Sequence, residues 1–216
     1  FGITDDKIVS EASRQEVIRR CFRYQCEYTM GLVDRETVQR VEKLMEDLDI
    51  KLEDRKVVGD ARRAAHEGQL KGKGNESVFC GAAIELPDGS IITGKNSSLM
   101  HASSSLILNS VKHLANIPDN MYLLPPSIIE SISRFRKEVL NRKMVSLDLE
   151  ETLIALCISA ATNPAAEMAV EKLKEIRDCE IHLTHLPTPG DEAGLRKLRL
   201  NITCDPNFST KDLFVC

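Results

Sequence analysis

The chain has no tryptophan, and aromatic residues make up only 4% of its 216 residues. Leucine, isoleucine, valine, alanine and methionine must therefore fill most of the core, which a chain of this length is large enough to form. No apolar run approaches the roughly 20 residues that a membrane-spanning helix needs, and no secretory signal opens the sequence. We therefore expect a cytoplasmic protein with no membrane partner.

Paired cysteine motifs are also missing. The chain has seven cysteines, an odd number, and no two are spaced C-x-x-C. Several lie in apolar runs such as IALCISAA, which is typical of buried free thiols in a reducing compartment. A formal net charge of −4, from 29 basic and 33 acidic residues, argues against a dedicated nucleic-acid or membrane-surface protein. We predict no nucleic-acid partner, no metal and no cofactor.

The first residue is Phe1 rather than methionine. We therefore expect the chain to be a fragment of a longer protein. Its own absent N-terminal half would then be a partner, and a function that needs that half would be invisible in this sequence.

Residues 1–75 have the pattern of a helical subdomain. Thr4, followed by two aspartates, can begin a helix that Gly31 ends, and Asp34 can cap a second one. The short connection favours an antiparallel hairpin, and the glycine-rich linker 68–74 follows later. Because the hairpin cannot cover its own apolar faces, we expect it to pack on the following domain, on the absent half or in a homo-oligomer.

Residues 76–216 alternate between strand and helix patterns, which favours an α/β subdomain. A buried run, a Pro-Asp-Gly turn and a second short run predict an opening hairpin. Together the strand patterns predict a mixed five-stranded sheet covered by helices on both faces. The expected strands are 79–86, 90–93, 121–124, 180–186 and 200–204.

The opening hairpin, followed by a helix that begins just after Gly94-Lys95-Asn96, resembles the cytidine-deaminase fold. In those enzymes H-x-E opens the first core helix and P-C-x-x-C lies where the next strand runs into its helix; His and both Cys hold zinc, and Glu moves protons. Here His101 is present, but Ser103 stands where Glu would be. We align the second pattern with Pro126-Ser127-Ile128-Ile129-Glu130, which has no thiolate. The resemblance therefore implies that zinc-dependent deamination is lost, and the same serine and glutamate also match a helix capping box.

The whole chain resembles a more specific family. The segments GITDDKIV, GLVDRETVQRVE, AAIELPDGSIITGK, ALCISAATNPAA and NITCDPNF are together similar to the family catalogued as domain of unknown function eighteen-forty-six. Its members are mostly bacterial and considerably longer, so the resemblance implies that this chain is their C-terminal half. It implies a helical subdomain followed by a deaminase-like α/β subdomain, and it implies no known activity.

Three expected helix starts carry small polar residues, and open α/β sheets bind ligands at such places. They are the serine-rich turn 95–105 and the starts near Ser127 and Asn163. Their N–H groups, with one lysine and one histidine, could bind a phosphate or carboxylate; alternatively the same side chains cap and pack tight turns. We expect the starts at His101 and Ser127 to converge over the sheet. The candidate ligand-binding residues are Lys95, Asn96, Ser98, His101, Ser103, Ser104, Ser127 and Asn163.

Two other arrangements have weaker support in the sequence. A nucleophile pair of His101 with Ser103, Ser104 or Ser105 lacks an obvious orienting acid and a nucleophile elbow. His182 and His185 are three residues apart on an expected strand, so they should point to opposite faces and not form a metal pair.

Three functional hypotheses follow. The first is a metal-free, deaminase-like domain that serves assembly or completes a site with the absent N-terminal half. The second is an enzyme or sensor that binds a small anionic, nucleotide-like metabolite at the Lys95–Ser105 turn. The third is a divergent metallohydrolase with His101 and Glu130 as ligands. The sequence leaves open whether the chain is an enzyme.

Overall fold

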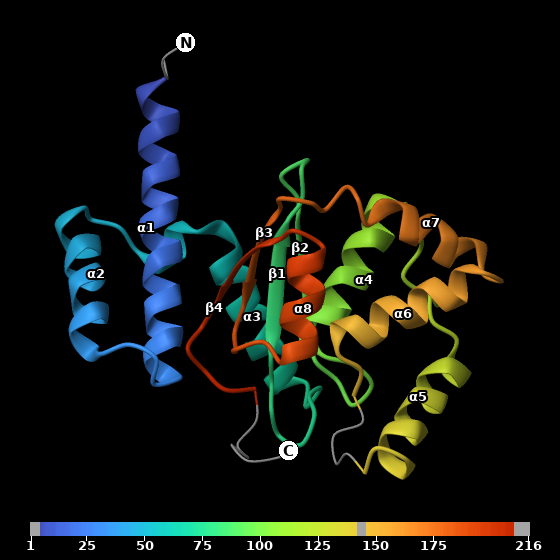
Figure 1. Ribbon diagram of the computed structural model, residues 1–216. Coiled ribbons are helices and arrows are strands. Elements are labelled where there is room, and N and C mark those ends of the chain that lie inside the picture. The colour runs from blue at the N-terminus through green and yellow to red at the C-terminus, as the bar shows by residue number, and fades with distance from the viewer. Residues whose placement is uncertain (1–4, 142–145, 210–216) are drawn as a thin grey trace.

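The computed structural model describes residues 5–141 and 146–209. An N-terminal helical region is followed by strands and helices that pack together, so the fold class is α/β (Figure 1). The helices are α1 (Asp6–Thr29), α2 (Arg35–Asp47), α3 (Lys56–Leu70), α4 (Ala102–Leu114), α5 (Pro126–Glu138), α6 (Leu149–Ala160), α7 (Pro164–Lys172) and α8 (Pro189–Lys197). The strands are β1 (Gly81–Glu85), β2 (Ile91–Lys95), β3 (Glu180–Leu183) and β4 (Asn201–Cys204).

Within the described residues, the strands form one mixed sheet in the order β2-β1-β3-β4. Strand β1 is antiparallel to both β2 and β3, and β3 is parallel to β4. Consequently β2 and β3 run in the same direction, and the helices that follow them, α4 and α8, begin at the same edge of the sheet.

The prediction of a fifth strand at residues 121–124 is wrong. The carbonyl oxygens of Tyr122 and Leu123 accept hydrogen bonds from the Asn163 side chain, at 3.0 and 3.4 Å, instead of from a neighbouring strand. The Tyr122 side chain is exposed, whereas Leu123 is buried against α4 and α6. Two prolines follow and provide no N–H group for a ladder, so the segment is an irregular connection.

Helices cover both faces of the sheet, as the alternation along β1 requires. Ala82 and Ile84 pack in one cluster with Leu106 of α4, whereas Ala83 packs on the other face with Ala61 of α3. The helix α3 crosses close behind β1, because a Cβ at Gly81 would lie 2.3 Å from the Ala61 carbonyl oxygen.

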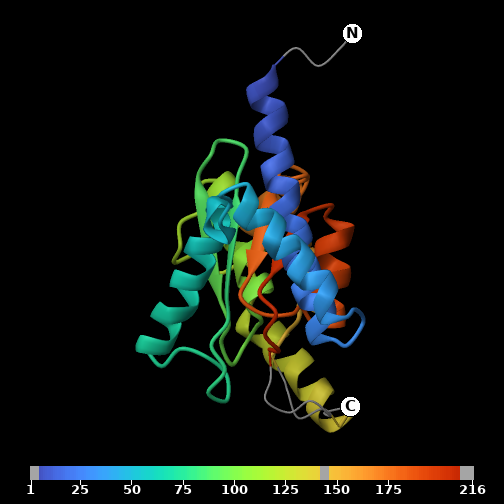
Figure 2. The same cartoon turned by 90° about the vertical axis from the view of Figure 1, so that its left-hand side faces the viewer.

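Helices α1 and α2 form the predicted hairpin, and it packs beside the sheet (Figure 1). The predicted helix start at Thr4 lies outside the described residues; Asp5 caps α1 by accepting hydrogen bonds from two backbone N–H groups. Phe22 and Met45 lie in the shared core of the hairpin. The N-terminal turns of α1 stand clear of the remaining fold in both views (Figures 1 and 2), and Ile8 is 67% exposed there.

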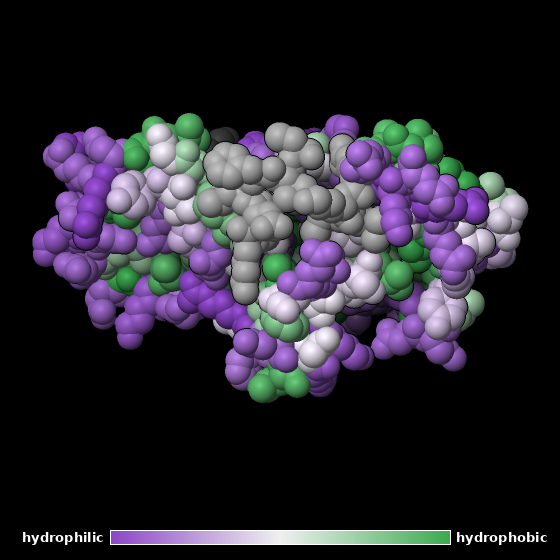
Figure 3. Space-filling view, turned by 90° about the horizontal axis from the view of Figure 1, so that it is seen from below, coloured by the Kyte–Doolittle hydropathy of each residue, from purple (hydrophilic) through white to green (hydrophobic). Residues whose placement is uncertain are grey.

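No helix within the described ranges is long and apolar enough to cross a membrane. Seen from below, most of the visible described surface is hydrophilic, and hydrophobic residues form several separate groups (Figure 3).

Candidate functional site

The starts of α4, α6 and α8 meet at one point beyond the carboxyl ends of β2 and β3. Backbone hydrogen bonds join the segment before α4 to the segment before α6: Leu147 N–H donates to Leu99 O and His101 N–H donates to Leu147 O, both at 2.9 Å. The start of α8 lies against α6, because a Cβ at Gly190 would be 2.3 Å from Asp148 Oδ2. A side chain at this position would have to displace the Asp148 carboxylate, so glycine allows the starts of α6 and α8 to approach closely.

Asp191 lies at the centre of this meeting point and is fully buried. Its Oδ1 accepts hydrogen bonds from Ser103 Oγ (2.5 Å) and from the Leu149 N–H group (3.0 Å). Its Oδ2 lies 2.7 Å from both His101 Nδ1 and Thr188 Oγ1. Because helix starts attract negative charge, the buried carboxylate is stabilised by all three helices.

Asp191 and His101 change each other's proton affinity. Burial raises the pKa of Asp191, but hydrogen bonds and charge from His101, with hydrogen bonds from Ser103 and Thr188, outweigh burial and lower its pKa to about 2. Burial lowers the pKa of His101, yet Asp191 raises it above the ordinary value overall. An ionised carboxylate only accepts hydrogen bonds, so Nδ1 of His101 must carry a proton. The pair is therefore a buried carboxylate and a histidine that Asp191 orients.

A cavity of about 40 Å³ adjoins this pair, and its lining includes Asn96, His101, Ser146, His185 and Asp191. His185 is only 3% exposed and Ser146 only 1%. Within the described part of the chain, His185 Nδ1 and Ser146 Oγ have no hydrogen-bond partner. Burial lowers the pKa of His185 to about 4, so its ring is neutral at pH 7. Two unsatisfied buried polar atoms beside a cavity indicate a place for a small hydrogen-bonding group.

Some of the predicted site residues lie at this cavity. His101 and Ser103 contact Asp191. Asn96 also lines the cavity, while its side chain accepts from Cys80 N–H at 2.8 Å and donates to Val78 O at 2.9 Å. Ser104 is buried nearby and donates to Leu147 O at 3.3 Å.

The other predicted site residues lie elsewhere. The Lys95 ammonium pairs with Glu67 of α3 at 2.7 Å. Ser98 is exposed in the turn before α4, and Asn163 caps α7 by accepting from Ala165 N–H at 3.0 Å. Ser127 is exposed in the first turn of α5, and the lining of the cavity beside His101 includes neither Ser127 nor Glu130.

Sequence reasoning missed Asp191, Thr188 and His185. The segment Thr188-Pro189-Gly190-Asp191 is a capped helix start, since Thr188 Oγ1 accepts from Asp191 N–H at 3.4 Å. The orienting acid that appeared to be absent near His101 is 90 residues away along the chain. Ser103 donates its hydroxyl hydrogen bond to Asp191 rather than to His101, so the two residues are not arranged as a nucleophile and its base. The sequence offered one weak signal, an aspartate in a capped helix start that follows the expected strand 180–186.

Comparisons with known proteins identify relatives over the whole chain. The family model described as "Domain of unknown function DUF1846, C-terminal" matches residues 53–214, and its N-terminal counterpart matches residues 1–49. Proteins named UPF0371 protein from Clostridium botulinum, strains Kyoto / Type A2 and Eklund 17B / Type B, are each 46% identical over 215 residues, and that of strain 657 / Type Ba4 is 45% identical. These matches cover 99% of this chain and 42% of each relative, so the chain spans less than half of their length. The family resemblance is thereby confirmed, and the chain belongs to the DUF1846 family.

Proposed function

We propose that the α/β part of this chain, residues 76–216, is a metal-free, deaminase-like domain that forms one wall of a ligand site. The remainder of the longer family proteins would complete that site. One observation carries the proposal: the lining of the small cavity beside the His101–Asp191 pair includes His185 and Ser146, whose buried atoms His185 Nδ1 and Ser146 Oγ have no partner among the described residues.

The order of elements supports the deaminase-like part of the proposal. In those enzymes the strand after the first core helix runs into a helix that begins with P-C-x-x-C. The strand after α4 is β3, and it runs into α8 through Pro187-Thr188-Pro189-Gly190-Asp191. On this alignment Thr188 and Asp191 stand where the two thiolates would be. This segment replaces residues 126–130 in the alignment, because those residues form the start of α5 and the described element before them is the helix α4 rather than a strand.

The side chains at these positions do not fit a zinc ion. The Thr188 hydroxyl is a poor ligand beside a thiolate, and both oxygens of Asp191 already accept hydrogen bonds. Ser103 cannot replace the proton-transferring glutamate. Within the described ranges, no three His, Cys, Asp or Glu side chains are placed to hold a metal. The metallohydrolase hypothesis is therefore weaker, also because Glu130 lines a different cavity, beside Leu99.

The orientation of His101 indicates how this side of the site could interact with a ligand. Asp191 holds Nδ1 of His101, which leaves the other ring nitrogen, Nε2, to interact with a ligand. A protonated ring can donate a hydrogen bond to a ligand oxygen, and a neutral one can accept a proton. A cavity of about 40 Å³ holds only the end of a metabolite, so further walls must come from another part of the protein.

An anionic metabolite at the Lys95–Ser105 turn has less support. Lys95 is paired with Glu67, and the negative charge that the helix starts attract is supplied by Asp191 itself. The Asp191 carboxylate would repel a second anion in this cavity, whereas it would not repel a neutral polar group.

A binding experiment with both parts of the protein tests the proposal. This chain would be studied alone and together with the preceding part of a clostridial relative, against nucleotides, sugar phosphates and their dephosphorylated forms. We expect a compound that raises the Tm only when both parts are present; a ligand at 100 times its Kd adds about 2.7 kcal/mol of stability. Light scattering on the same samples measures the association of the two parts and the homo-oligomer that we also propose.

Two variants provide the controls. His101→Gln should abolish the ligand-induced shift, whereas Ser98→Ala, in the exposed turn before α4, should leave it unchanged. Binding that survives His101→Gln, or an equal shift with this chain alone, would contradict the proposal.

A further inference from the structure

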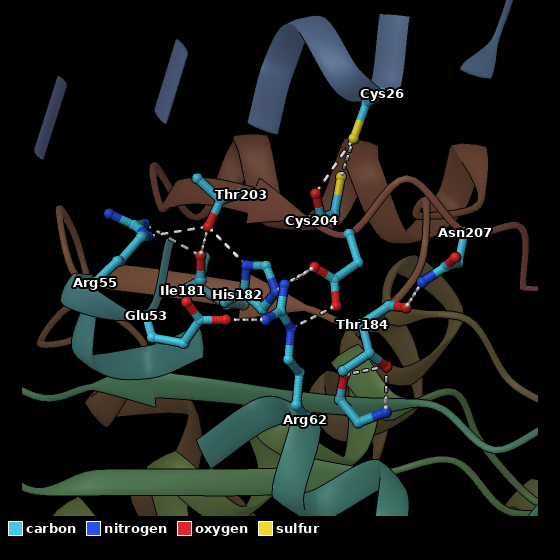
Figure 4. Close-up of polar contacts among 12 residues, drawn as sticks. Cys26, Glu53, Arg55, Arg62, Ile181, His182, Thr184, Thr203, Cys204 and Asn207 are labelled. Carbon is cyan, nitrogen blue, oxygen red and sulfur yellow. Dashed lines mark hydrogen bonds and ion pairs between the residues drawn. The ribbon is translucent and has the colours of Figure 1, made fainter. Parts of the chain in front are cut away.

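Cys26 of α1 and Cys204 of β4 face each other across the contact between the helical hairpin and the sheet (Figure 4). Their sulfur atoms are 3.5 Å apart, and Cys26 Sγ also lies 3.2 Å from the Cys204 carbonyl oxygen. The two cysteines are 178 residues apart in the chain. They also lie in segments that match different family models, the N-terminal one over residues 1–49 and the C-terminal one over 53–214.

Two further contacts, both N-terminal to Cys26 along α1, hold this helix against the sheet. The Phe22 ring packs on the His182 ring with centroids 4.8 Å apart, and Arg19 forms an ion pair with Glu180 at 3.1 Å. A disulfide needs a sulfur–sulfur distance of about 2.05 Å. The sulfur atoms are therefore close enough for a modest side-chain rotation to join them, without separation of the two elements.

A small oxidant can reach the pair from solvent. An open groove of about 410 Å³ is lined by both cysteines and by residues of α1 and α8, including Arg23 and Glu192. Cys204 is partly exposed, whereas Cys26 is 6% exposed. Cys204 is thus the thiol that meets the oxidant first, and Cys26 is the nearby thiol that can react with the product.

We propose that Cys26 and Cys204 form a disulfide on exposure to hydrogen peroxide. This bond would cross-link α1, in the segment matched by the N-terminal family model, to β4, in the segment matched by the C-terminal one. In the first step the Cys204 sulfur attacks one peroxide oxygen, the O–O bond breaks, and one water leaves as a sulfenic acid forms. In the second step the Cys26 sulfur attacks the Cys204 sulfur, the S–O bond breaks and the second water leaves. Two thiols are oxidised, one peroxide is reduced, and both thiol protons leave in the two waters.

Both thiols of the pair are free in the structure. The hydrogen bond with Cys26, followed by burial, raises the pKa of the Cys204 thiol, and a thiol reacts with peroxide only as its thiolate. The disulfide therefore forms slowly and needs sustained peroxide.

Mass spectrometry of the peroxide-treated chain tests the proposal. After free thiols are blocked and the chain is digested without reductant, we expect a linked peptide containing Cys26 and Cys204. We also expect a Tm rise on the order of 5 °C or more, reversed by dithiothreitol. The matched control is Cys157→Ser, which removes an exposed thiol and should leave both results unchanged.

Two outcomes would overturn the proposal. One is recovery of Cys26 and Cys204 in separate peptides from folded wild-type chain after prolonged peroxide treatment. The other is an equal peroxide-induced Tm rise in Cys26→Ser or Cys204→Ser, which cannot form this bond.

Discussion

Asp191 is a buried carboxylate whose two oxygens face hydrogen-bond donors from three helices. A buried charge without partners would cost several kcal/mol, and here His101, two hydroxyl groups and one backbone N–H group replace its water. His185 lines the same cavity but is uncharged and less well paired. Burial keeps its ring neutral, and its Nδ1 atom has no hydrogen-bond partner in the described part of the chain. The two residues therefore respond to pH in different ranges.

The pH dependence of stability should reveal His185. Between pH 6.5, its ordinary pKa, and about 4, its pKa in the folded chain, the unfolded chain binds a proton that the folded chain does not. The free energy of unfolding therefore falls as pH falls, by up to about 1.4 kcal/mol per pH unit for this residue. Buried His182 also has a lowered pKa and adds to the slope.

Urea denaturation at several pH values between 4.5 and 7 would measure this slope in wild type and in His185→Gln. We expect the variant to lose the share that belongs to one proton while it keeps the share that belongs to His182. Parallel slopes for the two proteins would mean that folded His185 takes up the proton.

At the scale of elements, two backbone contacts place the helices on the sheet. Gly81 of β1 approaches α3, and Gly94 of β2 approaches α4 so closely that a Cβ would lie 2.3 Å from the Leu106 nitrogen. The second contact fixes the start of α4, and hence His101, relative to the edge of the sheet.

Gly94→Ala should destabilise the chain by about 2 kcal/mol or more, because the new methyl group must displace backbone atoms of α4 rather than a side chain. The matched control is Gly59→Ala in α3, where a Cβ would meet nothing within 4 Å. That change should stabilise the chain by about 0.4–1 kcal/mol through the higher helix propensity of alanine. Urea denaturation of both variants measures the difference, and an equal effect would refute the predicted close packing.

At the scale of the whole molecule, a buried polar network and one aromatic contact join the hairpin, α3 and the far strands. Arg55, just before α3, donates to Thr203 Oγ1 and Asn201 O, both at 2.9 Å, and forms an ion pair with Glu180. Arg62 of α3 donates to both carboxylate oxygens of Asp205, at 3.1 and 2.7 Å. The hairpin joins this network through Arg19 of α1, which also pairs with Glu180, and through the Phe22 ring, which packs on the His182 ring. Because these contacts are buried or partly buried, we expect the hairpin and the sheet to unfold together.

Phe22→Ala tests whether the hairpin and the sheet unfold in a single transition. Phe22 is 1% exposed, and its removal should lower the free energy of unfolding by about 3–5 kcal/mol while a single transition is retained. Phe135→Ala is the control, because this ring is 51% exposed on α5 and its loss should cost less than about 0.5 kcal/mol. Circular dichroism during urea denaturation measures both; separate transitions for hairpin and sheet would contradict the expectation.

Features that depend on near neighbours in the chain were predictable from residue patterns. Asp34 caps α2 and Asn163 caps α7, as their positions indicated. The Pro-Asp-Gly turn joins β1 to β2, with Gly89 at a φ of 82° that favours glycine. Each of these features rests on hydrogen bonds or dihedral angles within a few residues, and such local preferences are written in the side chains concerned.

Features that depend on distant partners were not predictable in this way. The segment 121–124 has the composition of a strand, yet it joins no sheet among the described residues, and the Tyr122 and Leu123 carbonyl groups accept hydrogen bonds from the Asn163 side chain. The pairing of His101 with Asp191 follows from β2 and β3 running in the same direction on either side of β1, which brings the helices after them together. Burial and pairing energies arise only after packing has excluded water, so residue patterns alone could not select Asp191 as the partner of His101.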